Sequence, residues 1–157
     1  MWVHTVALFI LGVVVVVGMG CMAPKRVGPK QTGNWAYSPH TVEIHPLSRF
    51  KNPLNPQEET LIMVHIEFKD GDGFACRGVG SLEVSLFAKN GQVLAKENIQ
   101  LQDEDVNFSR FDPVTRTYQV RFNNVPPELE RVSVQATYTP NGQRSIESQP
   151  HTIHNNR

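Results

Sequence analysis

The sequence predicts an all-β protein that folds as a single antiparallel β-sandwich of immunoglobulin-like or related topology, with about seven strands. Three observations lead to this prediction. Apolar and polar residues alternate with a period of two through several stretches after Thr41. Turn-forming residues separate these stretches, and no window shows the apolar stripe of an amphipathic helix. Strands with one apolar face bury it most often against a second sheet, and a small barrel is the alternative.

The N-terminal segment, residues 1–20, has the composition of a signal peptide. From Val6 to Gly20 it carries no charged residue. As a helix this run would span about 22 Å, which is short of a bilayer core of about 30 Å. Its start has no Lys or Arg, so an uncleaved anchor and a start codon upstream of Met1 remain alternatives.

The end of this apolar run, Gly18-Met19-Gly20-Cys21, resembles the lipobox of bacterial lipoproteins, in which a signal peptidase cuts just before a lipidated cysteine. Gly20 matches the small residue of that pattern. Gly18 stands where Leu is usual, and Met19 is bulkier than the usual residue; the Gly-x-Gly spacing also fits ordinary signal peptidase cleavage. The resemblance implies lipid on Cys21 and a membrane-anchored protein of the cell envelope, outside the cytoplasm, either periplasmic or surface-facing.

Residues 21–40 then form a flexible tether, because three prolines and two glycines interrupt residues 22–40 without apolar periodicity. The β domain occupies residues 41–157. Its strands are predicted from five alternating stretches whose apolar faces follow in chain order: Val42 and Ile44; Ile62, Val64, Ile66 and Phe68; Leu82, Val84, Leu86 and Ala88; Tyr118, Val120 and Phe122; Val132, Val134, Ala136 and Tyr138.

The dipeptide Asn90-Gly91 predicts a two-residue type I′ hairpin. This turn sets Leu86 opposite Ala95, Leu82 opposite Ile99, and Phe87 beside Leu94. Apolar residues then meet apolar residues, which supports the register. Glu97 falls opposite Val84 in this register, and that mismatch indicates a bulge or a sheet edge.

A second hairpin is predicted at Thr139–Gln143, with a three-residue loop. Pro140 suits the second position of the turn, and Gly142 suits a left-handed backbone. This loop sets Ile146 opposite Ala136, on the apolar face.

Charge excludes one class of partner. The chain has 15 basic and 15 acidic residues, for a formal net charge of zero. No basic stretch is interleaved with aromatic residues, so no nucleic-acid partner is expected.

Two acidic stretches are weak candidates for a metal site. Asp70 and Asp72 alternate with Gly71 and Gly73 after a strand, and Asp103 and Asp105 lie in a later acidic stretch. Carboxylates from two loops at one end of a sandwich would suit calcium. The alternative interpretation is a Gly/Asp turn and a solvated acidic loop, and no other cofactor is expected.

No constellation of catalytic residues is present, so the protein is predicted not to be an enzyme. Cys76 stands beside Arg77, which favours a thiolate, but nothing in the sequence brings His65 to it as a base. His151 and His154 would point to opposite faces of a strand, which argues against a shared metal.

Two classes of function follow from these features. The first is a non-enzymatic envelope module that binds a protein or polysaccharide partner, or has a structural role, with Phe87 and Leu94 as a contact patch. The second is a calcium- or carbohydrate-binding domain that uses the acidic loops. Fold alone does not choose between them.

Overall fold

The computed structural model describes residues 38–53, 60–126 and 128–156. The described part is mostly β, which confirms the all-β part of the prediction, and it contains eleven strands and one short helix. In chain order the elements are β1 Thr41–Ile44, β2 Arg49–Lys51, β3 Leu61–Lys69, β4 Ala75–Cys76, β5 Gly80–Phe87, β6 Val93–Gln100, α1 Glu104–Arg110, β7 Phe111–Asp112, β8 Thr117–Phe122, β9 Arg131–Pro140, β10 Ile146–Glu147 and β11 His151–His154. Within these described ranges no helix is long and apolar enough to cross a membrane.

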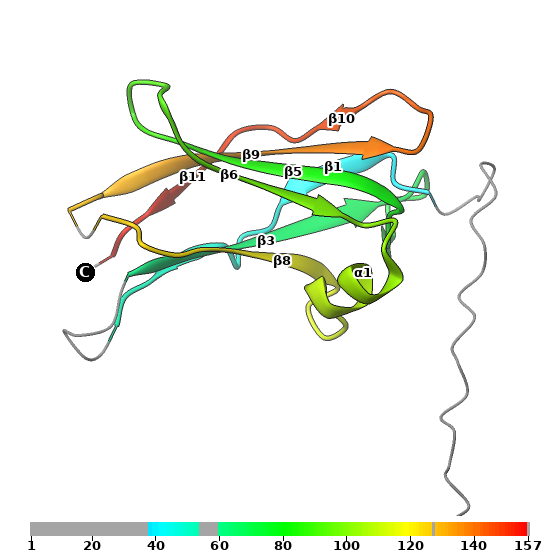
Figure 1. The fold of residues 1–157 in the computed structure, drawn as a ribbon, viewed down its shortest axis with the longest axis horizontal. Coiled ribbons are helices and arrows are strands. Elements are labelled where there is room, and N and C mark those ends of the chain that lie inside the picture. Colours follow the sequence, from blue (N-terminus) through cyan, green and yellow to red (C-terminus); the bar gives the residue numbers. More distant parts are fainter. Residues whose placement is uncertain (1–37, 54–59, 127, 157) are drawn as a thin grey trace, which may run out of the picture. The chain divides into compact units, whose positions relative to one another are not determined.

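The strands form two antiparallel sheets. The first has the order β1-β3-β8-β7, with β2 and β4 also paired to β3. The second has the order β10-β9-β5-β6, with β11 also paired to β9. The two sheets lie one above the other, and α1 lies at one end of them (Figure 1).

One hydrophobic core lies between the two sheets and draws residues from both. In β3 every second residue is fully buried, as the period of two predicted. The second sheet contributes the apolar faces of β5 and β9. Each large apolar side chain that is fully buried contributes about 1.5–3 kcal/mol to folding. The core residues with no exposed surface are Ile62, Val64, Ile66, Phe68, Leu82, Val84, Tyr118, Val120, Val134 and Ala136.

The first hairpin differs from the prediction in its turn and agrees with it farther along. Ala88 N donates to Gln92 O and Gly91 N donates to Ala88 O, so the loop has three residues, with Gly91 in the left-handed region (φ 81°). Phe87 therefore pairs with Val93, and the predicted pairing of Phe87 with Leu94 is wrong. A bulge beside Phe87 takes up the extra residue and restores the predicted register, in which Leu86 faces Ala95. The pairing of β5 with β6 therefore follows from burial of their apolar faces, and the length of the turn follows from that pairing.

Glu97 does pair with Val84, and β6 is the outermost strand of its sheet, so the predicted edge is confirmed. At the second hairpin the predicted partner of Ile146 is wrong. Ile146 pairs with Tyr138 because Gln143 N donates to Pro140 O, which makes Pro140 the first residue of the turn. Gly142 has the predicted left-handed backbone (φ 70°).

The strand count also exceeds the prediction. Short strands such as β2, β4 and β7 have two or three residues each, too few to show a period of two in the sequence. The helix α1 was not predicted either, because its residues were interpreted as a solvated acidic loop. Asp103 instead caps the helix, and its carboxylate accepts hydrogen bonds from Asp105 N and Val106 N.

Candidate functional site

Cys21, the predicted lipid-bearing residue, and the tether up to residue 37 lie outside the described residues. The structure does describe the other residues singled out in the sequence.

Asp70 organises the turn between β3 and β4. Its side chain is buried, and Oδ1 accepts hydrogen bonds from Asp72 N at 3.0 Å and Phe74 N at 2.9 Å. These bonds occupy the oxygen that would otherwise be offered to a cation. Asp72 is exposed on the same turn. The arrangement is that of an Asp side chain stabilising a Gly-rich turn.

Asp103 has a comparable role at α1. Its Oδ1 accepts from Asp105 N at 3.0 Å and from Val106 N at 3.1 Å. The structure does not unite the two acidic pairs: among the described residues no group of three or more His, Cys, Asp or Glu side chains could hold a metal ion. Sequence patterns for calcium ligands and for capped turns both use Asp, and Asp70 and Asp103 accept hydrogen bonds from backbone amides.

Asn107, on the buried side of α1, joins the helix to Tyr118 of β8 and to the loops that precede β5 and follow β6. Its Nδ2 donates to Gly78 O and to Leu101 O, each at 2.7 Å. Its Oδ1 accepts from the Tyr118 hydroxyl at 2.8 Å, and that hydroxyl accepts from Gly78 N at 3.2 Å. Every polar atom of the Asn107 side chain is therefore paired, as a buried amide requires.

Cys76 lies in β4, partly buried against the core. Burial, and to a lesser extent the charge of Asp70, raises the pKa of Cys76 to about 11 from its ordinary 9.0. Arg77, which was expected to favour the thiolate, instead lies over the Phe111 ring at 4.2 Å from its centroid. The thiol is therefore neutral near pH 7, when a nucleophile would need to be ionised.

His65 lies in β3 and is buried, with Nδ1 2.9 Å from Thr117 Oγ1. Burial lowers the pKa of His65, with smaller contributions in the same direction from Arg49 and His45, while Asp112 raises it. The neutral imidazole is thus favoured in the folded protein, so this group's contribution to stability is lost as pH falls below about 6.5. Within the described residues His65 makes no hydrogen bond to Cys76.

The predicted contact patch lies at one end of the second sheet, on its face away from the core. Phe87 is half-buried and lies directly opposite Val93, which is 44% exposed. Leu94, the residue displaced by the bulge, is 43% exposed. The structure brings these three apolar residues together, although with Val93 as the partner of Phe87.

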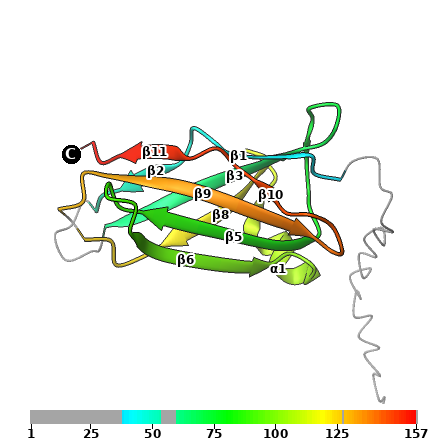
Figure 2. The ribbon, with the colours of Figure 1, turned by 90° about the horizontal axis from the view of Figure 1, so that it is seen from above.

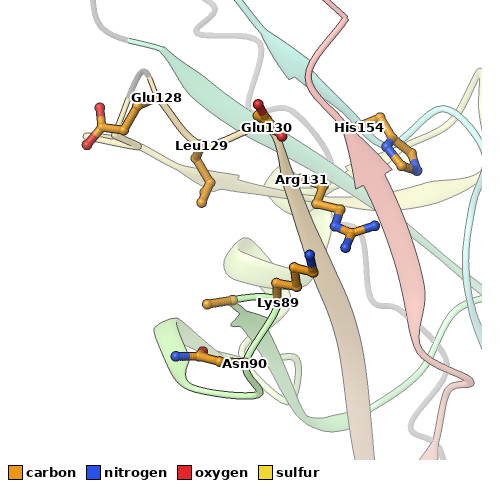
Figure 3. A pocket seen from close by; sticks show the side chains of 8 residues that line it. Lys89, Asn90, Glu128, Leu129, Glu130, Arg131 and His154 are labelled. Carbon is orange, nitrogen blue, oxygen red and sulfur yellow. The ribbon is translucent and has the colours of Figure 1, made fainter.

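A groove of about 590 Å³ opens at the same end of the domain. The β5–β6 turn and the start of β9, which line it, lie at the end of the sheet opposite to α1 (Figure 2). It lies between the turn that follows β5 and the segment that leads into β9. Basic side chains on one side of it are Lys89, Arg131 and His154, and the segment Glu128–Glu130 lines the other side (Figure 3). The sequence did not indicate this groove, because it depends on how β11 pairs with β9 and β11 was not predicted as a strand.

Comparison with known proteins gives no relative with which this site can be compared. No family model, curated protein or solved structure matches the chain. The functional argument therefore depends on the residues of this chain alone.

Proposed function

We propose that the chain is an exported lipoprotein whose body is a β-sandwich of immunoglobulin-like or related topology, and that it acts as a non-enzymatic binding module in the cell envelope. The observation that carries the binding role is the outward apolar patch formed by Phe87, Val93 and Leu94. Apolar side chains clustered on an otherwise polar sheet face are typical of a contact surface. The Gly18–Cys21 segment supports the anchoring role.

The order of the strands supports the immunoglobulin-like assignment. Setting aside β4 and β7, which have two residues each, seven strand positions remain if β1 with β2 and β10 with β11 each count as one. In a constant-type immunoglobulin domain the first, second and fifth strands share one sheet, and the third, sixth and seventh share the other. The present chain has the same division, with its fourth strand, β6, paired to β5 in the second sheet.

The anchoring role is tested with Cys21→Ser. Full-length wild-type protein is expected to partition into the detergent phase, because two or three acyl chains anchor a protein stably. The variant is expected to carry no acyl chain and to remain as the uncut precursor, which the intact mass of the protein would show. Cys76→Ser, which alters the only cysteine among the described residues, serves as the control and is expected to behave as wild type. A Cys21→Ser protein that is still processed and membrane-bound would exclude lipid at this position.

The contact role is tested with Phe87→Ser. Cross-linking in cells that make the protein naturally is expected to give a specific adduct, reduced about tenfold or more in the variant, because buried aromatic anchors dominate contact surfaces. Val114→Ser is the matched control, since Val114 is 88% exposed in the turn between β7 and β8, outside the patch. Equal adduct formation by Phe87→Ser, with an unchanged melting temperature, would remove the patch as the contact surface.

A further inference from the structure

We infer that the groove beside the Phe87 patch is a binding site for an acidic polysaccharide, whose anionic groups are held by Lys89, Arg131 and His154. This inference rests on the proposed binding function and names the chemical class of the partner. It is carried by the position of these three residues in the sheet, by the space in front of them and by the polar face that continues from them.

The three basic residues form a row across neighbouring strands. His154 of β11 pairs directly with Arg131 of β9. Phe87, the last residue of β5, pairs with Ser133 of β9, and Lys89, in the turn that follows β5, lines the same groove as Arg131 and His154. Arg131 and Ser133 are two apart on β9 and share a face, so Arg131 lies on the face that carries Phe87. Figure 3 shows the ends of Lys89 and Arg131 close together, with the His154 ring beyond them.

The two permanent charges of the row are not neutralised within the protein. All three residues of the row are exposed. In the part of the chain that the structure describes, neither Lys89 nor Arg131 forms an ion pair, whereas Lys96 on the same sheet lies 2.8 Å from Glu83. Unpaired cations that share one groove favour an anionic ligand, and the planar guanidinium of Arg131 matches a carboxylate, phosphate or sulfate group.

Two carboxylates also line the groove, but among the described residues neither forms an ion pair with Lys89 or Arg131. Glu130, which precedes Arg131 in the chain, is exposed. In Figure 3 the carboxylate of Glu128 points away from the three basic side chains. The groove volume of about 590 Å³ lies within the range of small-ligand sites.

The surface that continues from the row favours a glycan over an acidic peptide. Beside the basic residues, on the same sheet, lies a second set of neighbours: Ser133 of β9, with Thr152 of β11 paired to it on one side and Phe87 of β5 on the other. Hydroxyl groups both donate and accept hydrogen bonds, which matches sugar hydroxyls, and an aromatic ring offers an apolar face to a sugar ring. A polymer with repeated anionic groups could contact the row and the Phe87 patch together.

The test is a calorimetric titration of the full-length protein in detergent with a galacturonate oligosaccharide, dextran sulfate and unmodified dextran. Binding is expected for at least one charged glycan, weakened by added salt, and not for dextran. Binding of galacturonate alone assigns carboxylate chemistry, and binding of dextran sulfate alone assigns sulfate or phosphate chemistry. Arg131→Gln is expected to weaken that binding about tenfold, and Lys89→Gln with Arg131→Gln to weaken it further. Arg121→Gln, which removes the same charge from β8 of the other sheet, is the matched control and is expected to bind within about twofold of wild type.

Three results would overturn the inference: no binding of either charged glycan, equal weakening by Arg121→Gln, or binding of polyglutamate as tight as that of the charged glycans. The titration is independent of where the protein resides in the cell. If the protein binds the glycan but Cys21→Ser is still processed and membrane-bound, the proposed anchoring is refuted and the glycan site is not.

Discussion

Gly80→Ala is expected to destabilise the folded protein by on the order of 3–5 kcal/mol, because the new methyl group has no space. A Cβ built on Gly80 would lie 2.2 Å from Thr139 O and 3.0 Å from the Cα of Pro140. Both atoms belong to the backbone of β9, the neighbouring strand, which cannot move without breaking the pairing of β5 with β9. The Gly80 φ of 156° adds backbone strain for any residue with a Cβ.

Gly91→Ala is the matched control for this effect. Gly91 also has a positive φ, at 81°, but nothing lies within 4 Å of a Cβ built there. Its substitution carries backbone strain alone and is expected to cost about 1 kcal/mol. Urea denaturation of both variants measures the difference. Equal midpoints for Gly80→Ala and Gly91→Ala would show that β5 and β9 do not approach each other this closely in solution.

The sequence predicted the main strands because burial imposes a period of two on them. β8, for example, buries Tyr118, Val120 and Phe122, the apolar face that the alternation predicted. Long strands such as β3 place four apolar residues on one face, and such a signal survives local irregularity. The same reason explains the first hairpin, where the predicted pairing of Leu86 with Ala95 holds although the predicted turn does not.

The turns and the site were less predictable, because they depend on contacts between distant segments. Turn type at Asn90-Gly91 was decided by a bulge beyond it, which no dipeptide pattern encodes. Lys89, Arg131 and His154 come together only because β11 pairs with β9 and the turn after β5 lies beside the start of β9. One signal for the helix was present: Asp103 is followed by two acidic residues, and Arg110 stands in the last turn, which matches the charges favoured at helix ends.

Asn107 was the least predictable of the structural residues, since an Asn in an acidic stretch is ordinarily exposed. Asn107→Ala is expected to destabilise the protein by about 2–4 kcal/mol, because it leaves buried backbone oxygens of Gly78 and Leu101 without their donor. The Tyr118 hydroxyl lies 3.4 Å from Gly78 O and can turn to that oxygen, so the loss is concentrated at Leu101. Ser109→Ala, an exposed site in the same helix, is the control and is expected to stay within about 0.5 kcal/mol of wild type.

Asn107→Asp tests the hydrogen bonds of this side chain alone, because Asp has nearly the same volume as Asn but no amide donor. A carboxylate has no donor for Gly78 O and Leu101 O, and its charge would lie against both carbonyl oxygens. Burial and these oxygens would raise the pKa of the new Asp in the folded state, so its protonated form is the one that folding favours. The stability deficit relative to wild type is therefore expected to be largest at pH 7 and to shrink as pH falls toward about 4. A deficit in urea denaturation that is constant between these pH values would contradict the burial of this side chain beneath α1.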